Sequence, residues 1–102
     1  MKKCCSDYLD EQFGGDADLV GEIYGEYVMS VNEKTAELNE AIKSEDWLRI
    51  DRIAHALKGN ALAAGDTEMA DTAIAIRKSV ALKEIDAINA SMVHIEELKG
   101  EL

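Results

Sequence analysis

Apolar residues recur every three or four positions along most of the chain, and no segment alternates apolar and polar residues as a strand does. Short polar or glycine-containing breaks divide the pattern. It predicts a short N-terminal helix and four longer helices, the first of these bent near residues 30–32: Ser6 to Phe13, Ala17 to Ile42, Trp47 to Gly65, Thr67 to Val80 and Ile85 to Leu98. We therefore expect an all-α fold, an antiparallel four-helix bundle with a short N-terminal helical extension, in one domain over residues 1–102.

Glycines and capping residues occupy positions that bear on how the helices end and pack. Gly65 fits the left-handed position just past a helix end. Asp66 or Thr67 is suited to cap the following helix, because either side chain accepts a hydrogen bond from an unpaired backbone N–H. We interpret Gly21 and Gly25, within GEIYG, as small residues that let two helices approach closely.

The charge balance of the chain limits the kinds of molecule that it can bind. Asp and Glu number 21 against 11 Lys and Arg, a net charge of −10. Such a surface repels phosphate backbones and anionic lipids, so we expect neither nucleic acid nor a membrane as a partner. No apolar run approaches the roughly 18 residues that cross a bilayer, and the start MKKCCSDYL lacks the apolar part of a signal peptide. We expect a cytoplasmic protein, and a monomer, because one bundle can bury its own apolar stripes.

Cys4 and Cys5 are the only cysteines, and they are adjacent. They are candidates for a redox or metal site, or else two ordinary thiols in a reducing compartment. We favour ordinary thiols, since no second pair of Cys or His residues stands at zinc-site spacing. We expect no metal and no cofactor.

His55 stands in the middle of the third segment, in AHALKGNALAAG. On a wheel of about 100° per residue, it lies about 150° from the centre of the apolar stripe. That stripe comprises Ile50, Ile53, Ala54, Leu57, Ala61 and Ala64. The imidazole should therefore face away from the core. Lys58 at i+3 and Gly59 at i+4 lie beside it, and Arg52 adds a second cation on that side.

These residue types suit a phosphoryl acceptor. A neutral imidazole is a nucleophile, an ammonium offsets phosphoryl charge, and a glycine leaves room for an incoming group. A glycine inside a helix costs about 1 kcal/mol relative to alanine, so its presence calls for a reason. The alternative is a histidine that idles on the surface. Leu48 and Leu62 lie on the same side, either as an apolar docking patch or packed against neighbouring helices.

The segment AHALKGNALAAG resembles the signature of histidine phosphotransfer (HPt) domains, with matches at His55, Leu57, Lys58, Gly59, Ala61 and Gly65. The likeness extends over most of the chain, from FGGDADLV to the last helix. The resemblance implies that His55 is the phosphorylated residue, that Lys58 supports the phosphate and that Gly59 gives a partner access.

The resemblance also implies a relay. A receiver domain of a response regulator or hybrid histidine kinase would dock on the His55 face, which includes Arg52, Leu48 and Leu62. His55 would take the phosphoryl group from its aspartate and pass it to another receiver aspartate. In several family members a glutamine on the next helix lies near the histidine, and Arg77 stands at the matching position, where it would contribute phosphate charge or pair with an acidic neighbour. No ATP-binding glycine loop is present, so we expect a phosphorylated intermediate rather than an enzyme.

Three other hypotheses compete with this one. The phosphoacceptor domain of a sensor histidine kinase places an acidic residue after its histidine and usually a proline later, whereas Ala56 follows His55 and the chain has no proline. The histidine-bearing domain of a chemotaxis-type kinase shares the fold but would need a kinase core downstream. A non-catalytic helical adaptor with an incidental histidine predicts that His55→Gln leaves function intact.

Overall fold

The structure, a computed structural model, describes all 102 residues and contains five α-helices and no strand. The helices are α1 (Lys3–Gln12), α2 (Ala17–Lys43), α3 (Trp47–Ala63), α4 (Thr67–Ala81) and α5 (Ile85–Lys99). The all-helical class expected from the sequence is confirmed. The first helix begins at Lys3 rather than Ser6, and α2 runs through residues 30–32 as one uninterrupted helix.

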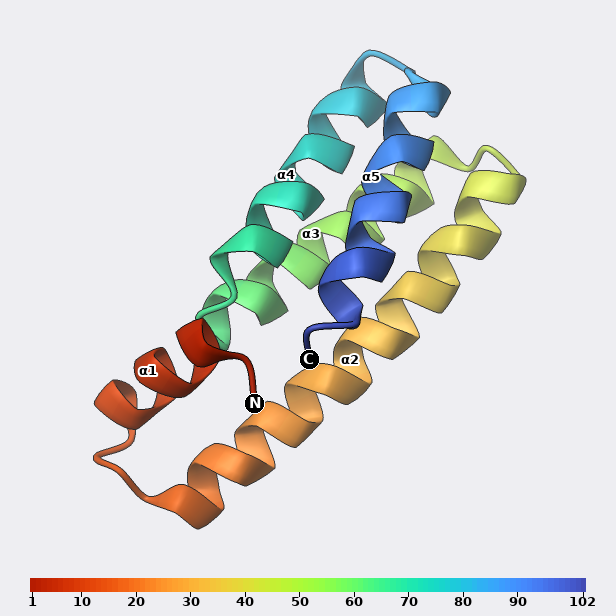
Figure 1. Cartoon of the computed structure of the whole chain (residues 1–102). Helices are drawn as coiled ribbons and strands as arrows, with labels where there is room; N and C mark the ends of the chain where they lie inside the picture. The colour runs from red at the N-terminus through yellow and green to blue at the C-terminus, as the bar shows by residue number, and fades with distance from the viewer.

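The four longer helices lie side by side along the length of the molecule, and the chain reverses direction at each connecting turn (Figure 1). Within this arrangement α3 packs against both α2 and α4, and α5 packs against α4 and α2. The short α1 lies at one end, next to the start of α2 and the turn between α3 and α4 (Figure 1). Helix α3 is therefore held on two sides, with its remaining face free.

One contiguous hydrophobic core draws residues from all five helices. Helix α3 contributes a single buried stripe at helical spacing, made of Ile50, Ile53, Ala54, Leu57 and Ala61. Because this stripe occupies one side of α3, residues about half a turn away must face outward. His55 is one of them.

Three turns of one design connect α2 to α5. In each turn one residue has a left-handed φ: Glu45 at 50°, Gly65 at 77° and Lys83 at 53°. The N–H of the following residue bonds to the carbonyl five positions back, at 2.9 to 3.0 Å, in the pairs Asp46–Ala41, Asp66–Ala61 and Glu84–Ser79. This pattern closes each helix end in the same way and positions the next helix.

Gly65 is the turn residue that must be a glycine. Glu45 and Lys83 adopt a similar φ, so the backbone angle alone tolerates a side chain. At Gly65, however, an added Cβ would clash with the side chain of Tyr8 from α1. Tyr8 thus packs directly on the backbone of the turn between α3 and α4, and the absence of a side chain there lets α1 dock.

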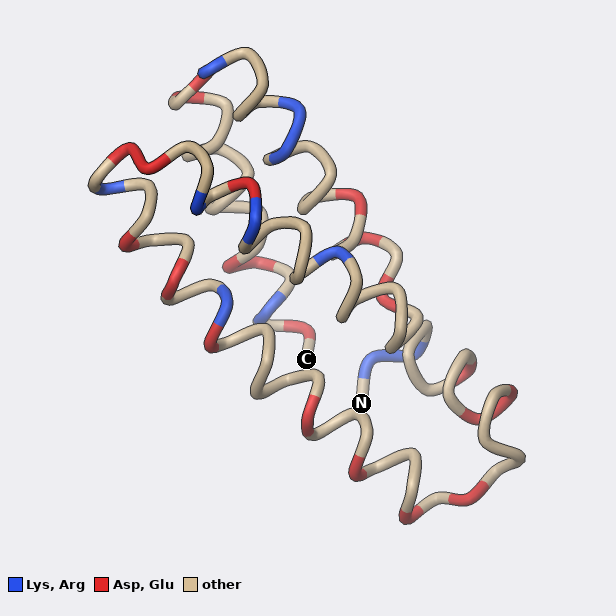
Figure 2. The backbone as a smooth tube through the Cα atoms, turned by 180° about the vertical axis from the view of Figure 1, so that it is seen from behind, with Lys and Arg blue, Asp and Glu red and all other residues tan.

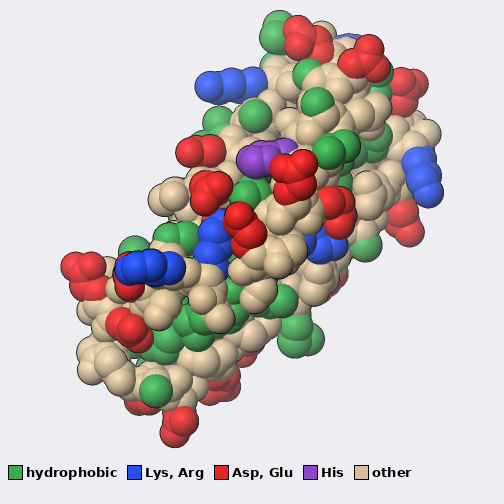
Figure 3. All heavy atoms as spheres, viewed as in Figure 1, with side chains coloured by type: hydrophobic (Ala, Val, Ile, Leu, Met, Phe, Trp, Pro, Cys, Tyr) green, Lys and Arg blue, Asp and Glu red, His purple; other side chains and the backbone are tan.

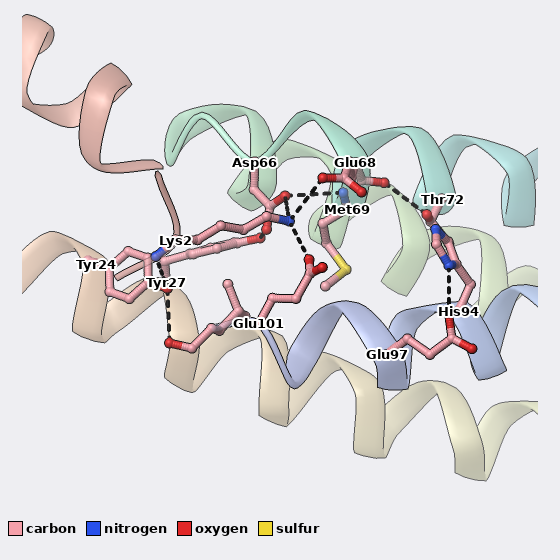
Figure 4. Close-up of polar contacts among 11 residues, drawn as sticks. Lys2, Tyr24, Tyr27, Asp66, Glu68, Met69, Thr72, His94, Glu97 and Glu101 are labelled. Atoms are coloured by element: carbon pink, nitrogen blue, oxygen red, sulfur yellow. Dashed lines mark hydrogen bonds and ion pairs between the residues drawn. The ribbon is translucent and has the colours of Figure 1, made fainter. Parts of the chain in front are cut away.

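A buried carboxylate, Asp66, joins three parts of the chain (Figure 4). Its Oδ1 accepts from the N–H of Met69 at 3.3 Å, which caps α4, and from Lys2 Nζ at 3.1 Å. Its Oδ2 accepts from the hydroxyl of Tyr27 on α2 at 2.7 Å. The Asp66 side chain is fully buried, and 9% of the Lys2 side chain is exposed. The expectation that Asp66 or Thr67 caps this helix is met by Asp66.

The surroundings of Lys2 stabilise its protonated, charged form. Burial lowers the pKa of Lys2, but hydrogen bonds and charges from Asp66, Glu101 and Glu68 outweigh burial and raise that pKa well above its ordinary value of 10.5. A raised pKa means that the stability contributed by these contacts is complete below about pH 10.5. It is lost only as pH rises through the higher pKa of the folded state.

The hydroxyl of Tyr24 brings the two ends of the chain together. It accepts from the backbone N–H of Lys2 at 3.1 Å and donates to the carbonyl of Leu102 at 3.1 Å. Both marked ends of the chain accordingly lie close together beside α2 (Figure 1). The N-terminal segment is therefore anchored by its backbone as well as by the Lys2 side chain.

Gly21 and Gly25 lie exposed on α2, and a Cβ added at either would meet no atom within 4 Å. The interpretation that they let two helices approach closely is wrong, because no neighbouring helix covers their face of α2.

Cys5 belongs to the core, whereas Cys4 is half-buried, and both thiols are free. Burial, followed by the nearby Cys4 and Asp66, raises the pKa of the Cys5 thiol. A thiol held protonated and inaccessible is a poor nucleophile, so Cys5 serves packing. None of the helices combines the length and apolar character required to cross a bilayer.

Replacing Asp66 with alanine is expected to lower the free energy of unfolding by about 2–4 kcal/mol, because the buried hydroxyl of Tyr27 would lose its acceptor and α4 its cap, while Lys2 would keep only Glu68 and Glu101 as partners. Asp46→Ala is the matched control. Asp46 caps α3 by the same bond, to the N–H of Arg49 at 3.2 Å, but is exposed, so its loss should cost about 1 kcal/mol. Urea unfolding of both variants measures the difference, and equal losses would contradict a stabilising network.

Gly65→Ala is expected to destabilise the fold by more than the roughly 1–2 kcal/mol of a left-handed alanine, because Tyr8 must also move. The double variant Tyr8→Gly/Gly65→Ala separates the two causes, because only glycine also removes the Tyr8 Cβ, the atom nearest to the added side chain. With Tyr8 already truncated, adding Gly65→Ala should cost only the backbone share. Chemical denaturation of the four proteins completes this cycle, and a Gly65→Ala cost that is the same in both backgrounds would show that Tyr8 is not the reason for the glycine.

Candidate functional site

His55 lies exposed on the outer face of α3, between buried neighbours that fix the helix. Ala54 and Leu57 are fully buried in the core, so the backbone that carries the imidazole is held rigidly. The ring nitrogen Nδ1 lies 3.0 Å from Nη1 of Arg77 on α4. One edge of the ring is therefore held by a cation.

Arg77 reaches His55 because of where the turn lies. His55 stands eleven residues before Asp66 and Arg77 eleven residues after it, so the reversal of the chain at the turn sets the two side chains opposite each other. Nε of Arg77 also donates to Oδ1 of Asp51 at 3.0 Å. Asp51 precedes His55 by four residues on α3, so all three side chains lie on the same part of the surface.

Further cations lie next to this trio. Lys58 is half-buried and lines a shallow groove between α3 and α4, whose other residues are Asp51, Ile74, Arg77, Lys78 and Ala81. Helix α3 carries three Lys or Arg residues against one Asp, and each other helix has at least as many acidic as basic residues. Seen from behind, Lys and Arg recur along α3 and the neighbouring part of α4, whereas acidic positions dominate α2 (Figure 2). The histidine thus lies on a cationic strip of a chain that is acidic overall.

Gly59 is exposed one turn after His55, and a Cβ placed there would meet no atom within 4 Å. Packing within the molecule therefore gives no reason for a glycine at this position. The helix accepts a propensity cost of about 1 kcal/mol and keeps open space beside the imidazole.

Apolar side chains flank the histidine along α3. Leu48 is 61% exposed and Leu62 is 50% exposed. Of the two interpretations left open by the sequence, the exposure of both leucines argues against packing on neighbouring helices. Arg52 is exposed on the same helix, three residues before His55. The structure therefore surrounds His55 with a surface of mixed apolar and cationic character.

Asn60 and His94 lie outside this surface arrangement. Asn60 donates through Nδ2 to Oγ of Ser30, which joins α3 to α2, and so serves helix packing. His94 lies on α5, with Nδ1 3.5 Å from Oε2 of Glu97 (Figure 4). It lines a separate groove that contains Glu68 and Asp71. Acidic side chains are prominent on the face seen in Figure 3, which includes α4 and α5. The two histidines thus lie in opposite charge environments.

The arrangement presents an accessible imidazole, cations beside it and room for an incoming group. It provides a nucleophile and charge for an anionic group, on a helix that does not need to move. Sequence reasoning did not assign a role to Asp51, although its position four residues before His55 was a signal. It also missed Lys78, whose proximity to Lys58 depends on how α3 and α4 pack.

Comparison with protein families connects this geometry to a known class. A family model described as Hpt domain matches residues 22–102, which include nearly all of α2 and the whole of α3, α4 and α5. The search of curated proteins and the search of solved structures each found no match. Since the family match covers well over half of the chain and contains the entire His55 site, the chain belongs to the Hpt domain family.

Proposed function

We propose that this protein is a phosphorelay intermediate in which His55 accepts a phosphoryl group from the aspartate of a receiver domain and passes it to the aspartate of another receiver. The single observation that carries this proposal is the exposed His55 imidazole on the one helix with a net positive charge, inside an Hpt domain. Open space at Gly59 and the ammonium of Lys58 support it. Because the chain has no ATP-binding glycine loop, the domain acts as a carrier of the group rather than as an enzyme.

The transfer is a substitution at phosphorus. A lone pair on a ring nitrogen of His55 forms the N–P bond as the P–O bond to the receiver aspartate breaks, and the electron pair leaves with that carboxylate. Lys58 lowers the energy of the transferring anion, while the receiver supplies a metal ion and most of the charge stabilisation. In the second transfer, the aspartate of another receiver attacks the phosphorus, the N–P bond breaks and His55 is free again.

Docking rests on the surface around the histidine. The exposed Leu48 and Leu62 provide apolar contact, and Arg52 and Arg77 provide charges complementary to an acidic receiver surface. We also infer that α2 to α5 form the antiparallel four-helix bundle expected from the sequence, with α1 as its extension. The monomeric state and the cytoplasmic location stay predictions from the sequence.

His55→Gln is expected to abolish phosphoryl acceptance, because glutamine keeps a polar side chain of similar reach but has no nucleophilic nitrogen. The assay mixes the protein with phosphorylated receivers from the same genome and follows labelled phosphate. Wild type should gain a label that is stable to base and labile to acid, as expected of a phosphoramidate. His94→Gln, the matched control, should be labelled like wild type. A failure with every receiver, in a folded helical protein, would contradict the relay and favour the adaptor.

Gly59→Gln is expected to raise stability by about 0.5–1 kcal/mol, because glutamine is a better helix former and the site is open. The same change should slow phosphotransfer by at least about tenfold, equivalent to 1.4 kcal/mol, because the side chain would occupy the space for the receiver. Gly25→Gln is the matched control, at an exposed and open glycine of α2, and should stabilise without slowing transfer. Unfolding curves and transfer rates of both variants check this. Equal rates would show that Gly59 does not provide access.

A further inference from the structure

We infer that Arg77 is a positioning residue that holds the single proton of neutral His55 on Nε2, so that the resting histidine cannot attack until the guanidinium leaves the ring. This inference rests on the proposed function and adds a restraint to it. The observation that carries it is the 3.0 Å contact between Nη1 of Arg77 and Nδ1 of His55.

The hydrogen-bonding chemistry of arginine decides which ring nitrogen carries the proton. A guanidinium has five N–H donors and no acceptor, and it stays charged. Nδ1 of His55 must therefore be the acceptor in this contact, which places its lone pair toward Arg77. The proton of the neutral ring then resides on Nε2.

Neither ring nitrogen is ready for attack in this state. The lone pair of Nδ1 is occupied by Arg77. Nε2 is the ring nitrogen that is free of Arg77 and so the one left for a bond to phosphorus, but in this state it carries the proton. Transfer to Nε2 needs the other tautomer, with the proton on Nδ1. Arg77 therefore has to disengage before the reaction, while the ring exchanges its proton through water.

Asp51 allows Arg77 to leave the His55 ring by a small movement. It holds Nε of Arg77 at 3.0 Å, so the planar guanidinium can pivot about this hydrogen bond and carry Nη1 away from the ring while it stays bound to the carboxylate. Asp51 also stands four residues before His55 on the same helix, where its carboxylate can accept a hydrogen bond from Nδ1–H. Nε2 then forms the N–P bond, the P–O bond to the receiver aspartate breaks, its carboxylate takes the electron pair, and the proton remains on Nδ1.

Arginine and the glutamine found at this position in several family members differ in the hydrogen bonds that they can make to the histidine ring. The side-chain carbonyl of glutamine can accept from an Nδ1–H and so favours the tautomer that exposes a lone pair at Nε2. Arginine can only donate and favours the opposite tautomer. The presence of Arg77 in this chain thus changes the resting state of the nucleophile.

The first test observes the proton directly and requires no phosphotransfer. Long-range ¹H–¹⁵N correlation spectra, recorded at a pH where the His55 ring is neutral and in a His94→Gln background, identify which ring nitrogen is protonated. Wild type should show a pyridine-like Nδ1 and a pyrrole-like Nε2. In Arg77→Met the freed Asp51 should draw the proton to Nδ1, and Arg77→Gln should shift the tautomers in the same direction. Arg49→Met is the matched control, since Arg49 is an exposed arginine paired with Glu40 at 3.6 Å.

The second test measures the consequence with phosphoramidate, a small phosphoryl donor that needs no docking. Arg77→Met should accept the phosphoryl group several-fold faster than wild type, while Arg49→Met should match wild type. An unchanged tautomer pattern in both Arg77 variants would overturn the inference. So would a changed pattern with an equal or lower rate in Arg77→Met. If no protein is labelled by phosphoramidate or by any receiver, the proposed function fails, and the spectra still decide whether Arg77 holds the proton.

Discussion

The packing of α4 against α3 depends on one buried carboxylate at the turn between them. Asp66 caps α4, binds the ammonium of Lys2 and accepts a hydrogen bond from the hydroxyl of Tyr27, so the first residues of α4 cannot shift without leaving buried donors unpaired. Because His55 and Arg77 are equally distant from Asp66 along the chain, the same constraint sets their contact. The hydrogen bonds of Asp66 at one end of α3 and α4 thereby fix a side-chain contact more than two helical turns away.

Helix α3 has one face in the core and another that presents the exposed His55. Its buried stripe, which includes Ile50 and Leu57, gives the imidazole a rigid support. Its outer face carries a glycine, several like charges and two exposed leucines that add nothing to the core. The glycine and the like charges lower the stability of the helix, as is usual where stability is traded for activity.

Local pattern was enough to predict much of this arrangement from sequence. The apolar stripe of α3 placed His55 outward, and the left-handed Gly65 and the capping Asp66 followed from turn chemistry. The predicted close helix packing at Gly21 and Gly25 was wrong, because small residues at this spacing also occur on a helix face that no other helix covers. The long-range contacts had no local signal. Lys2 and Asp66 are 64 residues apart, and the pairing of Arg77 with Asp51 depends on how α4 lies against α3.

The hydroxyl of Tyr24 joins the backbone of Lys2 to the carbonyl of Leu102, so the path of the chain enters and leaves the bundle at nearly the same point. A domain with this geometry can be carried inside another polypeptide, because the host chain can depart and return without pulling the helices apart. Both linkers would join the domain beside Tyr24 on α2 rather than at the helix that bears His55. The topology is therefore compatible with insertion into a larger polypeptide, with the face that bears His55 left clear of both linkers.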